Sequence, residues 1–101
     1  MDDIIYLIRQ SYQRNEYGVR VPSKDRKKVF AKVLSVTRAE FFEGGRNGLN
    51  PQFRFDVFAA DYHEETVVEY KGKRYSVYRV YRDIASDYLE LYVERKGGTN
   101  G

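Results

Sequence analysis

The sequence has 101 residues, of which 42% are hydrophobic and 33% are charged, and its formal net charge at pH 7 is +3. A chain of this length builds one modest core, so a second domain is excluded, and we expect a single domain over residues 1–96 with a disordered tail over residues 97–101. The absence of cysteine excludes disulfides, thiolate catalysis and cysteine-ligated zinc.

The first part of the chain predicts three strands. Residues 4–9 carry mostly apolar side chains on both faces, as in a strand that is covered twice or lies at a subunit contact. This apolar run is too short for a membrane span and follows two acidic residues, so neither a span nor a signal peptide is expected. Residues 19–22 predict a short edge strand that ends at Pro22, because proline donates no ladder hydrogen bond. Residues 28–36 predict another two-faced strand.

A helix and a glycine-rich loop are expected next. Thr37 and Glu40 have the spacing of a capping box, in which the threonine hydroxyl accepts from the third helical N–H and the glutamate reaches back to the N–H of the cap residue. The helix is expected over residues 38–42, with a stop at Gly44 and with Phe41 and Phe42 available to fix it to the barrel. The composition of the segment that follows favours a mobile, projecting loop. This loop comprises Glu43, Gly44, Gly45, Arg46, Asn47, Gly48, Leu49, Asn50 and Pro51.

The rest of the chain alternates apolar and polar residues in the manner of half-buried antiparallel strands. A tight hairpin is expected at residues 71–73, where Gly72 takes a positive φ. In the last strand, Leu89, Leu91 and Val93 are expected to face the core. The expected strands are residues 53–59, 66–70, 74–82 and 88–96.

Strands of this number and length indicate a closed sheet. Six or seven short strands within 101 residues protect their edges by rolling into a barrel. The sequence therefore predicts an all-β fold, a small antiparallel β-barrel of about six or seven strands with one short helix and a mobile glycine-rich loop.

Residues that could carry catalysis or bind a metal are few. His63 is the single histidine, and the serines considered as its partners lie in no nucleophile-elbow context. Asp61, His63 and Glu65 fall on one side of an extended segment and have donors for a divalent metal, but a polar turn with solvated charges is the preferred interpretation. The glycine-rich segment lacks the lysine and the serine or threonine of a phosphate-binding loop. We expect no enzymatic activity, catalytic residue, cofactor or metal. The serines considered are Ser35, Ser76 and Ser86.

Basic clusters and tyrosines raise the question of nucleic-acid binding. Tyr75, Tyr78 and Tyr81 lie on one predicted strand and could stack on bases. Alternation places Tyr75 and Tyr81 on one face and Tyr78 on the other, so they form no single platform. The surplus of aromatic residues equally indicates subunit contacts, and the residues alone leave both interpretations open. The basic clusters are Lys24, Arg26, Lys27 and Lys28, and Lys71, Lys73 and Arg74.

Four blocks carry a resemblance to a known family and together span nearly the whole chain. They are residues 2–8, 26–33, 35–49 and 68–79, and the most specific part is Glu40-Phe41-Phe42. In these blocks the sequence resembles the phage head-closure proteins, which are also called head-tail connector, adaptor, joining or stopper proteins. The likeness is greatest to members from phages and prophages of Gram-positive bacteria.

The resemblance implies a virion structural subunit with a small β-barrel. Such a protein is made in the cytoplasm of the bacterial host and joins the portal and adaptor ring proteins after DNA packaging. It forms a ring that closes the filled head and offers an interface to the tail-completion protein, although the isolated subunit is often monomeric. Its location is the virion, at the head-tail interface, with packaged DNA in the channel and no membrane contact. The alternative function is a sequence-independent nucleic-acid-binding barrel.

The resemblance also implies roles for particular residues. In the family, a long loop between barrel strands projects into the channel as a gate, and this loop corresponds to residues 43–51 here. Phe41, Phe42, Arg46 and Arg54 are the expected subunit or ring contacts. The two arginines could instead meet DNA phosphates.

Overall fold

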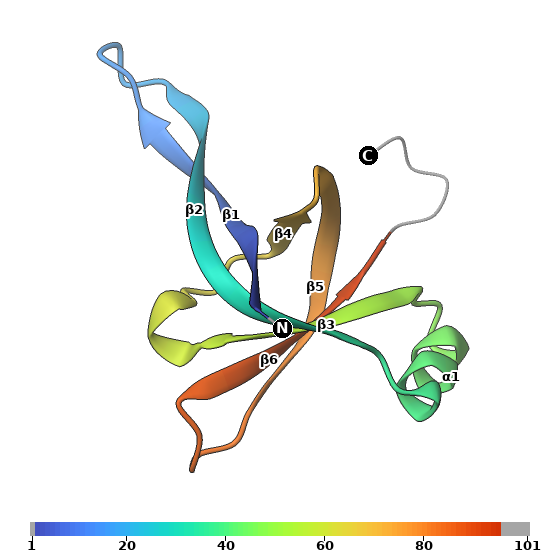
Figure 1. Ribbon diagram of the computed structural model, residues 1–101. Helices are drawn as coiled ribbons and strands as arrows, with labels where there is room; N and C mark the ends of the chain where they lie inside the picture. Colours follow the sequence, from blue (N-terminus) through green and yellow to red (C-terminus); the bar gives the residue numbers. More distant parts are fainter. Residues whose placement is uncertain (1, 96–101) are drawn as a thin grey trace.

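A computed structural model describes residues 2–95 of the protein (Figure 1). Six β-strands close into an antiparallel barrel in the order β1-β2-β3-β6-β5-β4, which confirms the predicted fold class. The predicted tail, residues 97–101, lies outside the described residues. The elements are β1 Asp2–Arg14, β2 Arg20–Ser35, α1 Arg38–Arg46, β3 Pro51–Phe58, the 3-10 helix η1 Ala59–Asp61, β4 Val67–Tyr70, β5 Lys73–Arg82 and β6 Tyr88–Glu94.

The core fills the barrel with inward-facing side chains from all six strands. Phe55 is the largest fully buried side chain, and its ring lies edge-on to that of Tyr70 at 5.4 Å. Phe53 contacts the rings of Tyr70 and Tyr75 in the same way, at 5.5 Å each. Edge-to-face contacts are favoured because the positive ring edge meets the negative ring face. The core residues, which include the three predicted from β6, are Ile5, Leu7, Val29, Ala31, Phe55, Val57, Val68, Tyr70, Tyr75, Leu89, Leu91 and Val93.

The hairpin between β4 and β5 has the predicted tight turn. Tyr70 pairs with Lys73, and the two residues between them, Lys71 and Gly72, have φ values of 51° and 78°. Two successive positive φ values match the right-handed twist of the flanking strands. The local turn chemistry therefore sets the register of this hairpin.

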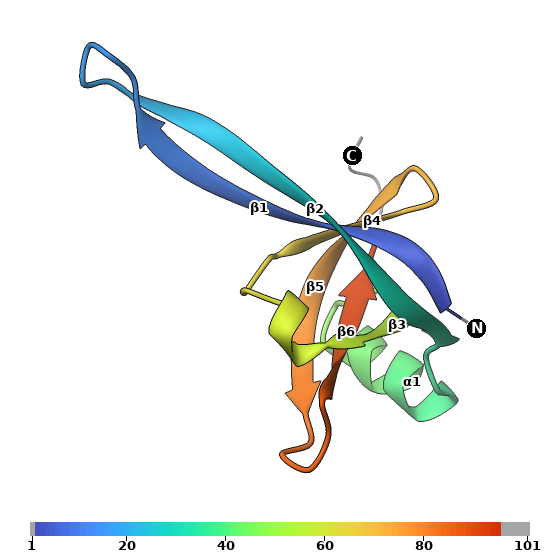
Figure 2. The same ribbon diagram turned by 60° about the vertical axis from the view of Figure 1, so that its left-hand side comes forward.

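The strands β1 and β2 continue well beyond the barrel as a two-stranded arm, residues 9–25 (Figures 1 and 2). They pair with each other out to Arg14 and Arg20, whereas β1 pairs with β4 only at residues 6–8 and β2 pairs with β3 only at residues 32–35. The expectation that a strand ends at Pro22 is wrong, because Pro22 pairs with Tyr12 inside β2. Proline is tolerated there because the described pairs leave the outer edge of β2 free in the arm.

A compact turn closes the end of the arm. The side-chain oxygen Oδ1 of Asn15 accepts hydrogen bonds from the backbone N–H groups of Tyr17, at 2.9 Å, and Val19, at 3.0 Å. Gly18 has a φ of 76°, a conformation that favours glycine. Asparagine commonly fixes a turn in this way through its own side chain.

The helix α1 begins as predicted and ends later. The backbone N–H of Glu40 donates to Thr37 Oγ1 at 3.1 Å, which confirms the N-cap. The helix does not stop at Gly44 but continues to Arg46, and the residue with positive φ that follows it is Gly48, at 78°. The expected loop over residues 43–51 is therefore wrong in extent: residues 43–46 belong to α1, Pro51 opens β3, and the connection is residues 47–50.

Gly44 is buried because α1 lies directly against the start of β3. A Cβ atom at Gly44 would lie 2.5 Å from Cγ of Pro51, whereas a Cβ atom at Gly45 would meet nothing within 4 Å. The glycine that composition marked as a helix stop is thus a point of close packing inside the helix.

Replacing these two glycines with alanine should give opposite results. Gly44→Ala should lower the free energy of unfolding by about 1–2 kcal/mol, because Pro51 must move away from the new methyl group. Gly45→Ala should raise it by about 0.5–1 kcal/mol, because alanine has the better helix propensity and no steric conflict. Urea denaturation followed by circular dichroism measures both changes. Stabilisation by both variants would show that α1 does not press on Pro51.

Candidate functional site

A polar contact joins α1 to β5. The hydroxyl of Tyr78 donates to Glu40 Oε2 at 2.6 Å, and Arg79 forms an ion pair with the same carboxylate. Burial raises the pKa of Tyr78, and the hydrogen bond to Glu40 raises it further. The predicted second half of the capping box is wrong, because the Glu40 side chain bonds to the barrel instead of its own cap residue.

A β-bulge in β5 makes this contact possible. The register shifts between Val77 and Arg79, so that Arg79 faces Tyr92 and Tyr78 is the extra residue. The guanidinium of Arg79 also lies over the Tyr92 ring, at 4.0 Å. The bulge breaks simple alternation, and the prediction that Tyr75 and Tyr81 share a face is wrong: Tyr75 is buried in the core and Tyr81 is exposed.

The aromatic residues of α1 do not fix the helix to the barrel. Phe41 and Phe42 are both exposed and lie edge-on to each other, with ring centroids 5.8 Å apart. Arg46 lies near Glu43 in the same helix, at 3.4 Å, and both side chains are largely exposed. The expectation that the two phenylalanines pin α1 is therefore wrong, while their exposure leaves them available to a partner.

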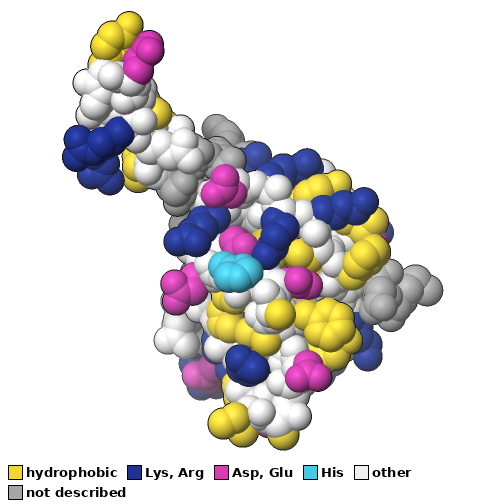
Figure 3. Space-filling model, turned by 90° about the vertical axis from the view of Figure 1, so that its left-hand side faces the viewer, with side chains coloured by type: hydrophobic (Ala, Val, Ile, Leu, Met, Phe, Trp, Pro, Cys, Tyr) yellow, Lys and Arg dark blue, Asp and Glu magenta, His cyan; other side chains and the backbone are white. Residues whose placement is uncertain are grey.

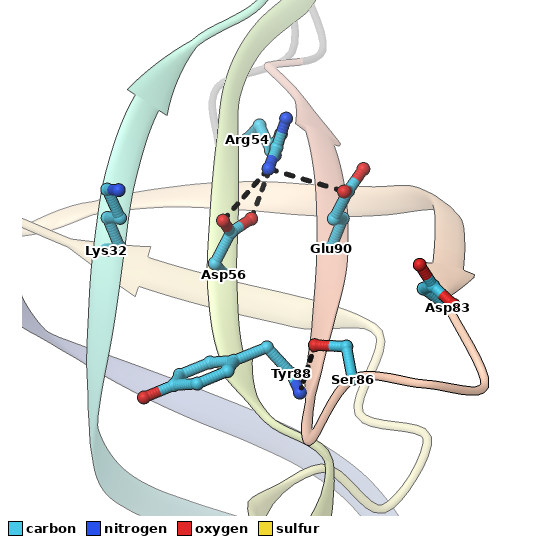
Figure 4. A pocket seen from close by; sticks show the side chains of 7 residues that line it. All are labelled: Lys32, Arg54, Asp56, Asp83, Ser86, Tyr88 and Glu90. Atoms are coloured by element: carbon cyan, nitrogen blue, oxygen red, sulfur yellow. Dashed lines mark hydrogen bonds and ion pairs between the residues drawn. The ribbon is translucent and has the colours of Figure 1, made fainter.

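The outer face of β2, β3 and β6 carries a row of charged residues in register. Lys32 pairs with Asp56, and Asp56 pairs with Glu90. Arg54 donates two hydrogen bonds to Asp56, at 2.8 and 2.9 Å, and lies 3.3 Å from Glu90 (Figure 4). The hydrogen bonds to Asp56 raise the pKa of Arg54. Arg54 is thus occupied by two carboxylates and does not offer the free guanidinium that phosphate binding requires.

A groove of about 460 Å³ lies over this charged row. Of the groove residues, only Arg54 was predicted from the sequence as a contact residue, because the others come from separate segments and meet only through the strand register. The signal available in the sequence was the pair Arg54 and Asp56, two residues apart on the polar face of a predicted strand. The groove is lined by Lys32, Arg54, Asp56, Asp83, Ser86, Tyr88 and Glu90 (Figure 4).

An aromatic row borders the groove on the same outer face. Phe58 pairs with Tyr88 across β3 and β6, and their rings stack at 4.5 Å. Ile4 pairs with Phe30 across β1 and β2, two residues before Lys32. All four side chains are exposed by at least a third, and Phe30 reaches 66%. Apolar surface is therefore exposed to water along this row. It is called the aromatic row below and consists of three aromatic residues and one isoleucine: Phe30, Phe58, Tyr88 and Ile4.

The basic cluster at residues 24–28 divides between different contacts. Arg26 forms an ion pair with Glu69 at 2.6 Å and lies over the ring of Tyr6 at 3.6 Å. Lys27 lies 3.2 Å from Nδ1 of His63. Arg26 and Lys27 therefore each have a partner within the protein, although both side chains stay partly exposed.

The segment considered for metal binding folds as a turn. The carboxylate of Glu65 is buried and accepts the backbone N–H of His63 at 2.5 Å. The hydroxyl of Tyr62 donates to the carbonyl of Glu65 at 2.7 Å. Within residues 2–95, no group of three histidine or acidic side chains is placed to hold a metal ion. Glu65 closes the turn, a role in which its burial is offset by hydrogen bonds.

No protein-family model and no curated protein matches this sequence. Among the described residues, no helix is long and apolar enough to cross a membrane. Figure 3 shows hydrophobic, acidic and basic side chains on the outer part of the arm and hydrophobic side chains between charges on the barrel. The features that bear on function are thus exposed surfaces.

Proposed function

We propose that this chain is a non-enzymatic structural subunit of the connector between the head and tail of a tailed phage. In this role it joins the portal and adaptor ring proteins after DNA packaging, closes the filled head as a ring, and presents an interface to the tail-completion protein. Its location is the virion. The resemblance of residues 35–49 to head-closure proteins supports this class of partners.

The observation that carries the proposal is a closed barrel with two separate exposed surfaces, the arm and the outer face of the sheet. Each subunit of a ring contacts one neighbour with one surface and the other neighbour with a different surface. A barrel with a closed core and no free barrel edge supplies a rigid body for such contacts. Phe41 and Phe42 on α1 provide a third exposed surface for a ring above or below.

The proposed gate becomes smaller than the resemblance implied. Residues 43–46 are held in α1 and Pro51 is buried at the start of β3, so the gating segment is residues 47–50 together with the end of the helix. Gly48 and Leu49 are tied back to α1 through hydrogen bonds to the carbonyls of Gly45 and Gly44, at 3.1 and 2.8 Å. In this proposal the gate is formed where the end of α1 and residues 47–50 of each subunit contact the same segments of the other subunits in the ring.

A stand-alone nucleic-acid-binding barrel is less well supported. Its proposed contributions were two basic clusters and stacking tyrosines. Arg26 and Lys27 of the first cluster are engaged by protein groups, Arg74 of the second lies 3.7 Å from Glu69, and Tyr75 lies in the core. Binding to duplex or single strands that falls steeply with salt would restore this alternative.

Deletion of the gene from a producing lysogen tests the connector role. The expected result is DNA-filled heads without tails, or heads that have lost their DNA, and a loss of infectious particles. Complementation with the wild-type gene should restore infectivity, and complementation with a chain shortened within residues 47–50 should restore assembly but not DNA retention if these residues gate the channel. Normal infectious particles from the deletion strain would refute the proposal.

A further inference from the structure

The described apolar side chains of the arm are left exposed by the rest of the described chain. Tyr12 and Tyr17 expose 57% and 80% of their surface, and Val19 and Val21 are exposed as well. The arm is a two-stranded ribbon, and such ribbons are only marginally stable in water on their own. Among the described side chains of the arm, one contact involves an aromatic ring: the guanidinium of Arg20 lies over the ring of Tyr12, at 4.9 Å. An extended element with exposed tyrosine and valine side chains is suited to lie on another surface.

The outer face of the barrel has the complementary properties. The aromatic row offers flat rings, foremost the stacked pair Phe58 and Tyr88. The adjoining groove carries the carboxylates of Asp56, Asp83 and Glu90 against two cationic groups. Asp83 forms no ion pair with any described residue, and its side chain accepts only the backbone N–H of Ala85, at 3.0 Å. The groove thus carries one carboxylate more than its cationic groups, and the carboxylate without an ion pair among the described residues is Asp83, beside an aromatic surface.

The charges of the arm match those of the groove. The arm carries exposed arginines at positions 9, 14 and 20, while Glu16 and Asp25 are its acidic residues. Opposite charges on two surfaces favour one docking register and accelerate association. Arginine also stacks on aromatic rings, as Arg20 already does on Tyr12, so the aromatic row suits the same side chains.

The arm cannot reach the groove of its own chain. In both Figure 1 and Figure 2, the arm leaves the barrel at one end, and the connection between β5 and β6, which carries Asp83 and Ser86, lies at the other. The molecule measures 51 Å along its longest axis. An arm that docks at this groove must therefore belong to another copy, and that arm carries more basic than acidic residues among those described.

We propose that the arm of one copy docks across the aromatic row and the groove of the next copy. The contact joins two different surfaces, so it is head-to-tail and propagates until a ring closes. For its biological role this inference rests on the proposed ring function. It adds the identity of the two surfaces that hold neighbouring subunits together.

Site-specific cross-linking tests the contact directly. A chain with Tyr17→p-benzoylphenylalanine is irradiated as concentrated purified protein and also inside phage-producing cells. The expected product is a covalent dimer in which mass spectrometry joins residue 17 to a peptide from β3 or β6. The same photoreactive residue at Lys71, on the turn between β4 and β5, is the matched control and should give no such product. Absence of the β3 or β6 cross-link under both conditions overturns the proposal.

Charge exchange supplies a second test, in which the yield of the covalent dimer cross-linked through residue 17 is the readout. Arg14→Glu with Arg20→Glu in the arm, or Asp56→Arg with Asp83→Arg in the groove, should each reduce the dimer yield about tenfold or more, because like charges then meet. An equal mixture of the two variants should recover the dimer, because each arm again meets a groove of opposite charge. Unchanged yields with folded variants, shown by circular dichroism, count against the contact.

The two proposals fail in different ways. Normal infectious particles from the deletion strain together with a specific cross-link would remove the phage role and leave the arm contact standing. Tail-less heads from the deletion strain without the cross-link would leave the phage role and remove the arm contact. A cross-link that maps to α1 instead of β3 or β6 would also overturn the assignment of the receiving surface.

Discussion

Phe55→Ala should lower the free energy of unfolding by about 3–5 kcal/mol, the largest loss expected from any single truncation in this barrel. Phe55 has no solvent exposure, and its ring contacts Phe53 at 5.8 Å and Tyr70 at 5.4 Å. Alanine removes both contacts and leaves a cavity that the closed sheet cannot easily fill, because six hydrogen-bonded strands resist collapse. Equilibrium urea unfolding, followed by far-ultraviolet circular dichroism, measures the change.

Phe30→Ala is the matched control, since it removes the same side chain from the outer face. Phe30 is 66% exposed, and we expect a loss of about 1 kcal/mol or less, mainly from strand propensity. Phe55→Leu keeps most of the volume and provides a measurable variant if Phe55→Ala does not fold. Equal losses for Phe30→Ala and Phe55→Ala would contradict a barrel with its core on the Phe55 side.

Local patterns were enough to predict the barrel and part of its core. The two-residue turn at Lys71 and Gly72 was visible because its backbone requirement is met by residues next to each other. The alternation of Leu89, Leu91 and Val93 identified the buried face of β6, because side chains of a strand point alternately to its two faces. Strand closure followed from the number of short strands.

The arm was not predicted, for a physical reason. A ribbon that leaves the barrel has water on both faces, so its sequence lacks the apolar alternation that marks a half-buried strand. Pro22 was interpreted as an end, although a strand with a free outer edge accommodates it. The signal that could have revealed the arm is the turn pair Asn15 and Gly18 with β-branched residues following it.

The remaining differences between the predicted and the observed structure depend on contacts between segments that are far apart in the sequence. Gly44 was interpreted from composition as a helix stop, but its role depends on Pro51, which a sequence pattern does not place beside it. The bulge after Val77 reverses the faces of the residues beyond it, so alternation misplaces Tyr81. The groove likewise requires Lys32, Asp56 and Glu90 to meet across three strands. The candidate surfaces therefore depend on pairings that become visible only in three dimensions.

Glu40→Ala should release α1 from the barrel and lower the free energy of unfolding by about 1.5–3 kcal/mol, because the loss removes hydrogen bonds to a charged group. Only 16% of the Glu40 side chain is exposed, and its two oxygens serve Tyr78 and Arg79. Without the carboxylate, the hydroxyl of Tyr78 is left half-buried with no acceptor. Hydrogen exchange should then show faster exchange along α1 than in β3 and β6.

Glu43→Ala, one turn further along α1, is the control. It separates the role of Glu40 in holding α1 to the barrel from the effect of losing one negative charge in the helix. The Glu43 side chain is 67% exposed and its ion pair with Arg46 is exposed, so the expected loss is about 0.5 kcal/mol or less.

The pH dependence of the unfolding free energy provides a second test of the contact between Glu40 and Tyr78. Because the pKa of Tyr78 is raised in the folded state, protonated Tyr78 stabilises the fold below the ordinary tyrosine pKa of about 10, and this stabilisation is lost as pH rises above it. Burial, the largest cause of the raised pKa, remains in Glu40→Ala, whereas the contribution of the hydrogen bond is removed. The total loss of unfolding free energy above that pH should therefore be smaller for Glu40→Ala than for the wild-type protein, and an equal loss would show that Glu40 does not hold Tyr78.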